Sequence, residues 1–209
     1  MSKLEGKFRE IFTEAKRTED IEQLPGIKEM KCSMEDLNKY AKWFVNGIQS
    51  GKIKVRDLVI DIRNSRLCVY GGIWIKGTWK NGTWKSGTWK SGTWETGTWE
   101  TGIWKSGIWR DGFWESGTWE SGIWKSGLWE DGIWKSGTWE DGTWKNGIWK
   151  NGIWKIGTWK NGTWKNGTWE TGFWQGGRWQ GGRWNGGWDD TKEVGKAVWH
   201  PKDDSPDKW

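Results

Sequence analysis

Histidine, cysteine and long apolar runs are scarce in this chain of 209 residues. The single histidine, His200, lies in a polar C-terminal segment, so the commonest general base and metal ligand is missing from the rest of the chain. The two cysteines, Cys32 and Cys68, have neither the spacing of a metal site nor the number that a disulfide framework requires. We therefore expect a protein that is not an enzyme and that needs no metal or cofactor.

No apolar run reaches the roughly 20 residues of a membrane-spanning helix, and no cleavable signal opens the chain. We expect no membrane insertion, and a location in the cytoplasm of a bacterium or host cell, or in a virion. Residues 1–70 hold 14 basic and 11 acidic residues, residues 71–187 hold 15 and 10, and residues 188–209 hold 4 and 6. This small excess makes nucleic acid a less favoured partner than protein.

Helical patterns come first along the chain. Residues 3–17 have an amphipathic spacing, which Leu24-Pro25-Gly26 interrupts. A second helix is predicted to begin at Ser33, which caps the first turn while Asp36 reaches back, and to end at Asn46-Gly47.

Alternating apolar residues then predict a strand over residues 53–62 and a turn at Asn64-Ser65. Residues 67–70 lead directly into the repeats. Residues 1–70 are therefore either a transition that covers the open end of the repeat region or a small independent α/β cap.

Glycine and tryptophan are abundant, with 33 and 27 residues, and they recur in pentads of the form Gly-x-Trp-x-x. Glycine occupies every fifth position from Gly72 to Gly187, and tryptophan every fifth position to Trp184. A period of five fits neither a helix nor a plain strand, so each pentad is predicted to be a short strand followed by a corner. Residues 71–188 form this repeat region.

The number of pentads per coil is predicted from the residue between glycine and tryptophan. Reading every fourth pentad gives a uniform threonine column: Thr78, Thr98, Thr118, Thr138 and Thr158. This column favours 20 residues per coil, just under six coils and a rod of roughly 28 Å. The sequence thus predicts a mainly β protein, a four-sided β-solenoid with a small α/β N-terminal cap.

The repeats resemble those of the pentapeptide-repeat proteins, whose unit is Ala-(Asp/Asn)-Leu-x-x. Residues 72–187 keep the five-residue step, with glycine in place of alanine and tryptophan in place of leucine. The resemblance implies a right-handed quadrilateral β-helix and leaves the function open. Similar Gly-x-Trp runs occur in uncharacterised proteins of bacteriophages and bacteria.

The tryptophans are expected to face inward with the glycines. Exposed indoles in such number would form an apolar surface far larger than soluble monomers tolerate. Buried indoles can stack from coil to coil, and each ring N–H then needs an acceptor such as a corner carbonyl. Binding of glycans by outward tryptophans is the least favoured alternative.

Two outward columns are candidate contact surfaces. A stacked lysine ladder is a candidate anion-binding edge, although a solvated ridge is the simpler interpretation; its members are Lys85, Lys105, Lys125, Lys145 and Lys165. Apolar columns are candidate protein-contact faces, with Ile73, Phe113, Ile133, Ile153 and Phe173 on one face and Ile108, Leu128 and Ile148 on its neighbour.

The repeat pattern changes at Trp188, where the tryptophan register shifts by one, and a polar tail follows over residues 189–209. Trp199 and Trp209 predict that this tail docks onto the chain or onto a partner. We expect a structural or protein-interaction protein, such as a bacteriophage virion or accessory component, that binds a protein partner or self-assembles. The alternative is a module that binds an anionic polymer such as nucleic acid.

Overall fold

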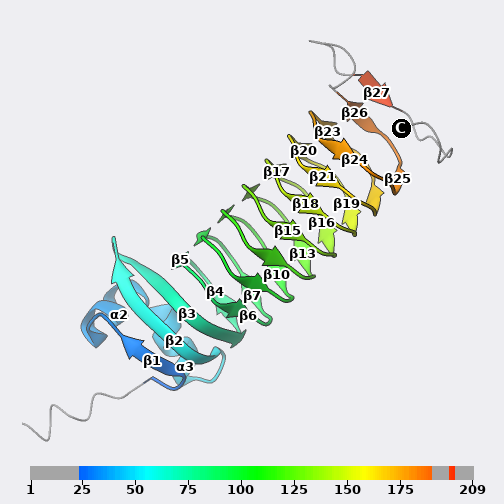
Figure 1. The fold of residues 1–209 in the computed structure, drawn as a ribbon. Coiled ribbons are helices and arrows are strands. Elements are labelled where there is room, and N and C mark those ends of the chain that lie inside the picture. Colours follow the sequence, from blue (N-terminus) through cyan, green and yellow to red (C-terminus); the bar gives the residue numbers. More distant parts are fainter. Residues whose placement is uncertain (1–23, 190–197, 201–209) are drawn as a thin grey trace, which may run out of the picture.

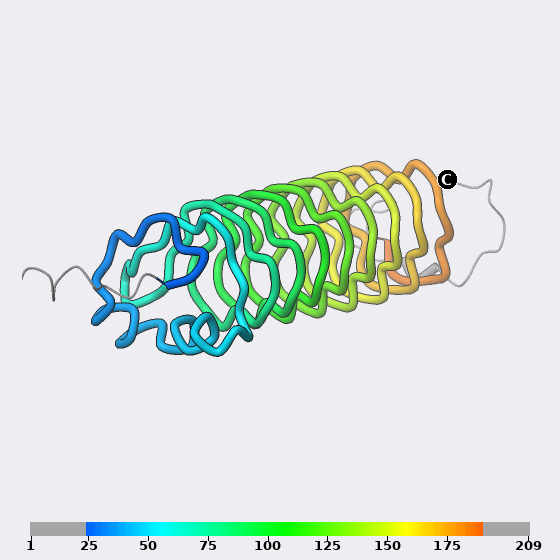
Figure 2. The backbone as a smooth tube through the Cα atoms, turned by 90° about the horizontal axis from the view of Figure 1, so that it is seen from below, coloured from blue at the N-terminus to red at the C-terminus, as the bar shows by residue number. Residues whose placement is uncertain are grey.

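Between the end coils, each Gly-x-Trp strand pairs in parallel with the strands fifteen residues before and after it. Trp109, for example, pairs with Trp94 and with Trp124. The computed structural model describes residues 24–189 and 198–200, and its repeats stack along one axis beyond an N-terminal cap (Figures 1 and 2). The mainly β parallel solenoid is confirmed. The predicted 20-residue coil is wrong, since three pentads close each coil.

The three sides of the solenoid are named here by chain order. Face 1 comprises the end of β3 (Arg66–Lys76), then β6 (Thr88–Trp89), β9 (Ile103–Trp104), β12 (Thr118–Trp119), β15 (Ile133–Trp134), β18 (Ile148–Trp149), β21 (Thr163–Trp164) and β24 (Arg178–Trp179). Face 2 comprises β4 (Thr78–Trp79), β7 (Thr93–Trp94), β10 (Ile108–Trp109), β13 (Ile123–Trp124), β16 (Thr138–Trp139), β19 (Ile153–Trp154), β22 (Thr168–Trp169) and β25 (Arg183–Trp184).

Face 3 lies below the Cys68–Val69 part of β3. It comprises β5 (Thr83–Trp84), β8 (Thr98–Trp99), β11 (Phe113–Trp114), β14 (Leu128–Trp129), β17 (Thr143–Trp144), β20 (Thr158–Trp159), β23 (Phe173–Trp174) and β26 (Gly187–Asp189).

Just under eight coils at about 4.8 Å each give a rod of about 37 Å, longer than the length expected from a 20-residue coil. The two residues after each tryptophan form the corner to the next face: the 1–2, 2–3 or 3–1 corner.

The packing geometry of the indole rings explains the triangular cross-section of the solenoid. Successive tryptophans meet edge to face, with the centroids of Trp104 and Trp109 6.0 Å apart and their planes 74° from parallel. Three such rings fill the section of one coil, whereas a square of four at this contact distance would leave its centre empty, against the close packing of protein interiors. The tryptophans from Trp74 to Trp169 are completely buried, so their inward orientation is confirmed.

The repeated glycines are required by the backbone. Gly142 has a φ of 122°, which residues with a side chain rarely adopt, and a Cβ there would collide with the carbonyl oxygen of Gly127 in the coil below. Most of these glycines are half-buried. Glycine is therefore needed for close stacking of the coils, and not mainly to leave room for a large neighbour.

Two helices lie where the sequence predicted one helix from Ser33 to Asn46-Gly47. Ser33 caps α2 (Met34–Tyr40) as predicted, since its Oγ accepts from the Asp36 amide at 3.0 Å. Ala41 then breaks the helix with φ −136° and ψ 35° before α3 (Lys42–Gln49). Gly47 does not end α3, because it lies inside that helix where the Ile53 side chain packs against it.

The cap sheet places α3 over the first coil. β1 (Ile27–Met30) pairs in parallel with β2 (Lys54–Arg63), and β2 pairs antiparallel with β3, which continues into the solenoid. From α3, Phe44 stacks 6.3 Å from Trp74, and Trp43 meets Trp79 edge-on at 5.5 Å. A helix therefore covers the open end of the indole core, and the cores of cap and solenoid are continuous.

At the other end, β26 continues the repeat register without a slip. Trp188 pairs with Phe173 and points outward, and Asp189 takes the buried inward position. β27 (Val198–His200) pairs antiparallel with β26, so part of the predicted tail docks on its own chain. The predicted helix over residues 3–17 and Trp209 lie outside the described residues. No helix in the described part is long and apolar enough to span a membrane.

Candidate functional site

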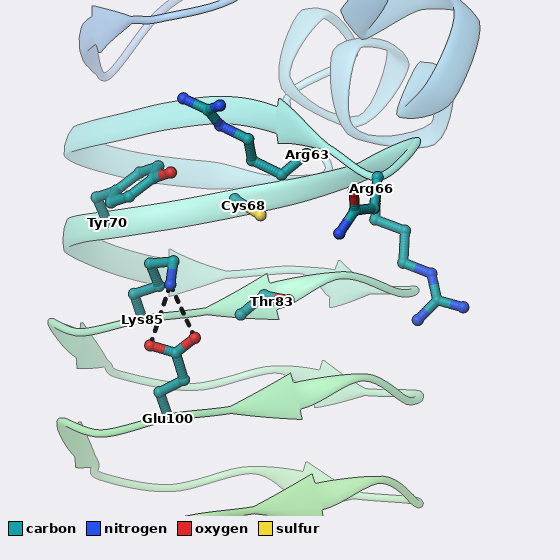
Figure 3. Close-up of a pocket in the computed structure, with 8 residues that line it drawn as sticks. Arg63, Arg66, Cys68, Tyr70, Thr83, Lys85 and Glu100 are labelled. Atoms are coloured by element: carbon teal, nitrogen blue, oxygen red, sulfur yellow. Dashed lines mark hydrogen bonds and ion pairs between the residues drawn. The ribbon is translucent and has the colours of Figure 1, made fainter.

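An open groove lies at the cap end of face 3 (Figure 3). The β2–β3 hairpin supplies one side of it and the first repeats supply the other. The lining side chains are mostly polar or charged: Arg63, Asn64, Arg66, Cys68, Tyr70, Thr83, Lys85 and Glu100. Asn64 and Ser65 form the tight turn that was predicted, with φ values of 49° and 59°.

The charges around the groove are largely paired. The Lys85 ammonium lies 2.9 Å from a carboxylate oxygen of Glu100 and 5.6 Å from the ring centroid of Tyr70. The hydrogen bond to Glu100 raises the pKa of Lys85. Arg63 Nε lies 2.6 Å from the Asp61 carboxylate, and this bond raises the pKa of Arg63. Of the three cations that line the groove, Arg63 and Lys85 are paired, and Arg66 forms no ion pair within the part of the chain that the structure describes.

Cys68 is the nucleophilic group of the groove. Burial raises the pKa of its thiol above the ordinary value of 9.0, so the thiol is protonated at neutral pH. Cys32 is also a free cysteine. Within residues 24–189 and 198–200, no three histidine, cysteine, aspartate or glutamate side chains are grouped closely enough to bind a metal ion. The residues that line the groove therefore do not indicate a particular chemical reaction.

The structure does not stack the five lysines of the candidate ladder. With fifteen residues per coil, a step of 20 moves each lysine to the next corner. Lys85 and Lys145 lie on the 3–1 corner, Lys105 and Lys165 on the 1–2 corner, and Lys125 on the 2–3 corner. The ladder as predicted is wrong, because it depended on the four-pentad coil.

Ion pairs instead join residues exactly one coil apart on the 3–1 and 2–3 corners. Lys145 lies 2.9 Å from Glu130 on the 3–1 corner, as Lys85 does from Glu100. On the 2–3 corner, Lys125 and Lys155 approach Glu140 from the coils above and below, at 3.6 and 3.7 Å. Both signs of charge are therefore present along these two edges, and opposite charges meet at several steps between coils.

The apolar columns are also redistributed over three faces. Ile73, Ile133 and Ile148 lie on face 1, Ile108 and Ile153 on face 2, and Phe113, Leu128 and Phe173 on face 3. Short stacks remain, such as Ile133 on Ile148 and Phe113 on Leu128, with half-buried side chains. The predicted continuous apolar face is therefore wrong. The most exposed aromatic pair is Phe173 and Trp188, whose ring centroids lie 6.4 Å apart.

The indole N–H groups find acceptors only in part. Five of them donate to a carbonyl oxygen seventeen residues later: Trp129, Trp144, Trp149, Trp159 and Trp164. Every acceptor belongs to an asparagine or a glycine at a corner. Other ring N–H groups, such as that of Trp104, have no hydrogen-bond partner among the described residues. Because the repeat indoles are buried, they are also not available to stack on sugars.

No protein-family model, curated protein or solved structure significantly matches this chain. The five-residue repeat and parallel solenoid are consistent with a pentapeptide-repeat fold, although the section is three-sided.

The residue before glycine is compatible with the true coil but does not by itself distinguish it from a 20-residue coil. The residue before glycine, taken every third pentad, gives a nearly uniform column: Ser91, Ser106, Ser121, Ser136, Asn151 and Asn166. These residues all lie on the 1–2 corner, where the hydroxyls of Ser121 and Ser136 donate to carbonyls of the preceding coil. Taken every fourth pentad, the same position gives Ser86, Ser106, Ser126, Asn146 and Asn166, so the hydrogen bonds to the preceding coil, and not the column, identify the stacking period.

Proposed function

We propose that this chain is a non-enzymatic structural rod that holds a protein partner along its length. The observation that carries this proposal is the unbroken indole core. Each ring between the end coils stacks on rings above and below and meets two more edge to face, as Trp109 does with Trp94, Trp124, Trp104 and Trp114. A rod packed in this way is suited to keep fixed distances along its axis.

Coil-to-coil hydrogen bonds add to this stiffness. The amide of Thr138 donates to Gly122 O at 2.9 Å and that of Glu140 to Trp124 O at 2.7 Å, and the same pair of bonds recurs between successive coils. Evenly spaced side chains on a rigid frame favour recognition by a partner that contacts several coils at once. A bacteriophage virion or an accessory complex is one assembly in which such a rod would serve.

Two internal deletions test this proposal in the organism that makes the protein. Removing residues 117–131 deletes one coil and keeps every later side chain on its face. Removing residues 117–121 deletes one pentad, keeps the Gly-x-Trp series and turns every later residue onto a different face. Both variants should keep a cooperative thermal transition, because the inward tryptophans continue to stack.

We expect tagged full-length protein and the one-coil deletion to co-purify a protein companion at fixed stoichiometry. The one-pentad deletion should lose it, because its faces no longer align. Recovery of no companion with the full-length chain, or equal recovery with the one-pentad deletion, would contradict docking along the rod.

A further inference from the structure

The positive charge of the solenoid is concentrated on one edge. Together with the flanking Arg178 and Arg183, the 1–2 corner holds eight basic residues and one acidic residue, Glu120, whereas the other two corners together hold seven and nine. We call six exposed lysines of this corner the basic ridge: Lys76, Lys90, Lys105, Lys135, Lys150 and Lys165. The modest net charge of +6 conceals this segregation of charge, which becomes apparent only when the residues are assigned to the corners of a fifteen-residue coil.

Like charges are adjacent along the basic ridge. Lys135, Lys150 and Lys165 occupy three successive coils, which are about 4.8 Å apart. Lys135 pairs with Glu120 at 3.2 Å, but Lys90, Lys105, Lys150 and Lys165 form no ion pair with any residue that the structure describes. Such alignment is unfavourable in the free protein. The other two corners carry basic and acidic residues in comparable numbers, and ion pairs join several of them across one coil.

Neighbouring basic residues extend the ridge at both of its ends. At the cap end, Lys54 pairs with Lys76 across β2 and β3. At the far end, Arg178 and Arg183 are exposed on the two faces that meet at this corner. The corner residues between the lysines are mostly serine and asparagine, whereas the other corners carry Asp111, Asp131 and Asp141. A positive edge therefore runs along almost the whole rod.

We propose that the basic ridge binds the phosphate backbone of nucleic acid, with the rod lying along the polymer. A straight row of regularly spaced charges fits a linear polyanion better than a compact acidic protein. A single convex edge meets a flat lipid surface only along a line. The rod of about 37 Å is close to one turn of duplex DNA, about 34–36 Å.

The side chains of the solenoid predict how specific its binding to nucleic acid should be. Lysine provides a point charge without the bidentate geometry that distinguishes bases. The repeat indoles are buried, so they offer no stacking platform for single-stranded bases. Binding should therefore be independent of base sequence and depend steeply on salt. This inference does not depend on the proposed protein partner.

The experiment uses purified full-length protein and a fluorescent DNA duplex of about 24 base pairs, followed by anisotropy from about 50 to 300 mM NaCl. The ridge variant is Lys135→Gln/Lys150→Gln/Lys165→Gln. The matched control is Lys80→Gln/Lys125→Gln/Lys155→Gln, which removes the same number of charges from the 2–3 corner. Thermal melts check that both variants fold like the parent chain.

For the parent chain we expect the logarithm of affinity to fall against the logarithm of salt with a slope of about −4 to −5. The ridge variant should bind at least about tenfold more weakly at 100 mM salt, with a slope smaller by about 2 to 3, and the control should change less than about threefold. Equal losses in both variants, no binding by the parent chain at the lowest salt, or tighter binding of polyglutamate or heparin than of the duplex would overturn the proposal.

Discussion

The indole rings of Trp114 and Trp129, fifteen residues apart in the chain, lie with their centroids 4.8 Å apart and their planes 7° from parallel. Both rings are completely buried. This stack recurs along the solenoid, so the stability of the rod should depend on the tryptophans far more than on the residues that precede them.

Trp129→Ala should lower the free energy of unfolding by roughly 3–5 kcal/mol, because it opens a large cavity in a narrow core. Thr118→Ala, at an outward position on face 1, should lower it by well under that amount. Urea denaturation of both variants measures the difference. Similar losses would mean that the indole is not a core residue.

Gly181 and Gly182 are adjacent, but the backbone requires glycine only at Gly182. Gly182 has a φ of 105°, and a Cβ there would collide with the Gly167 carbonyl, whereas a Cβ on Gly181 has its nearest neighbour at 3.5 Å. Gly182→Ala should cost more than about 1 kcal/mol and Gly181→Ala a few tenths. The two melting temperatures provide the comparison; equal shifts would argue against the positive-φ stacking geometry.

The ion pair between Lys145 and Glu130 predicts an energetic coupling between these two residues, which lie one coil apart. Both side chains are about 40% exposed, so a double-mutant cycle with glutamine should give only about 0.2–1 kcal/mol, and less in high salt. A cycle between Lys145 and Lys125, 20 residues apart, should give no coupling. Coupling in the second cycle alone would favour a four-pentad coil.

Cys68 should react slowly with thiol reagents. Burial raises the pKa of its thiol above 9.0, so less thiolate forms at a given pH than in the unfolded chain. The folded state therefore favours the neutral thiol, and this contribution to stability is complete below the unfolded pKa and lost as the pH rises through the folded pKa. In a Cys32→Ser variant, disulfide-exchange labelling at several pH values should be slower in native than in denatured protein. Equal rates would contradict burial.

Much of the fold follows from the sequence because the repeat imposes it. The five-residue period predicts strand and corner, and the size of the indoles predicts that they face inward. The number of pentads per coil was predicted wrongly, because Thr98 and Thr118 lie at outward positions that stacking constrains weakly. The residue before glycine is as uniform every fourth pentad as every third, so it is the hydrogen bond from Ser121 to the preceding coil, and not the column, that indicates three pentads.

The candidate surfaces failed for the same reason. Which lysines stack on one another depends on the number of pentads per coil. With four pentads in place of three, Lys85 was placed beside Lys105, although the two lie on different corners. The break at Ala41 and the pairing of β1 with β2 depend on packing between distant segments, which local patterns do not reveal. The orientation of Trp188 depends on its pairing with Phe173 in the preceding coil.

The most direct test of the three-pentad coil is oxidative cross-linking of paired cysteines in a Cys32→Ser/Cys68→Ser background. Thr143 and Thr158 are register partners on face 3, so cysteines there lie within the distance that a disulfide requires. Thr138 and Thr158 would be partners in a 20-residue coil but lie on different faces here. We predict a disulfide in Thr143→Cys/Thr158→Cys and none in Thr138→Cys/Thr158→Cys; the reverse result would contradict the three-sided solenoid.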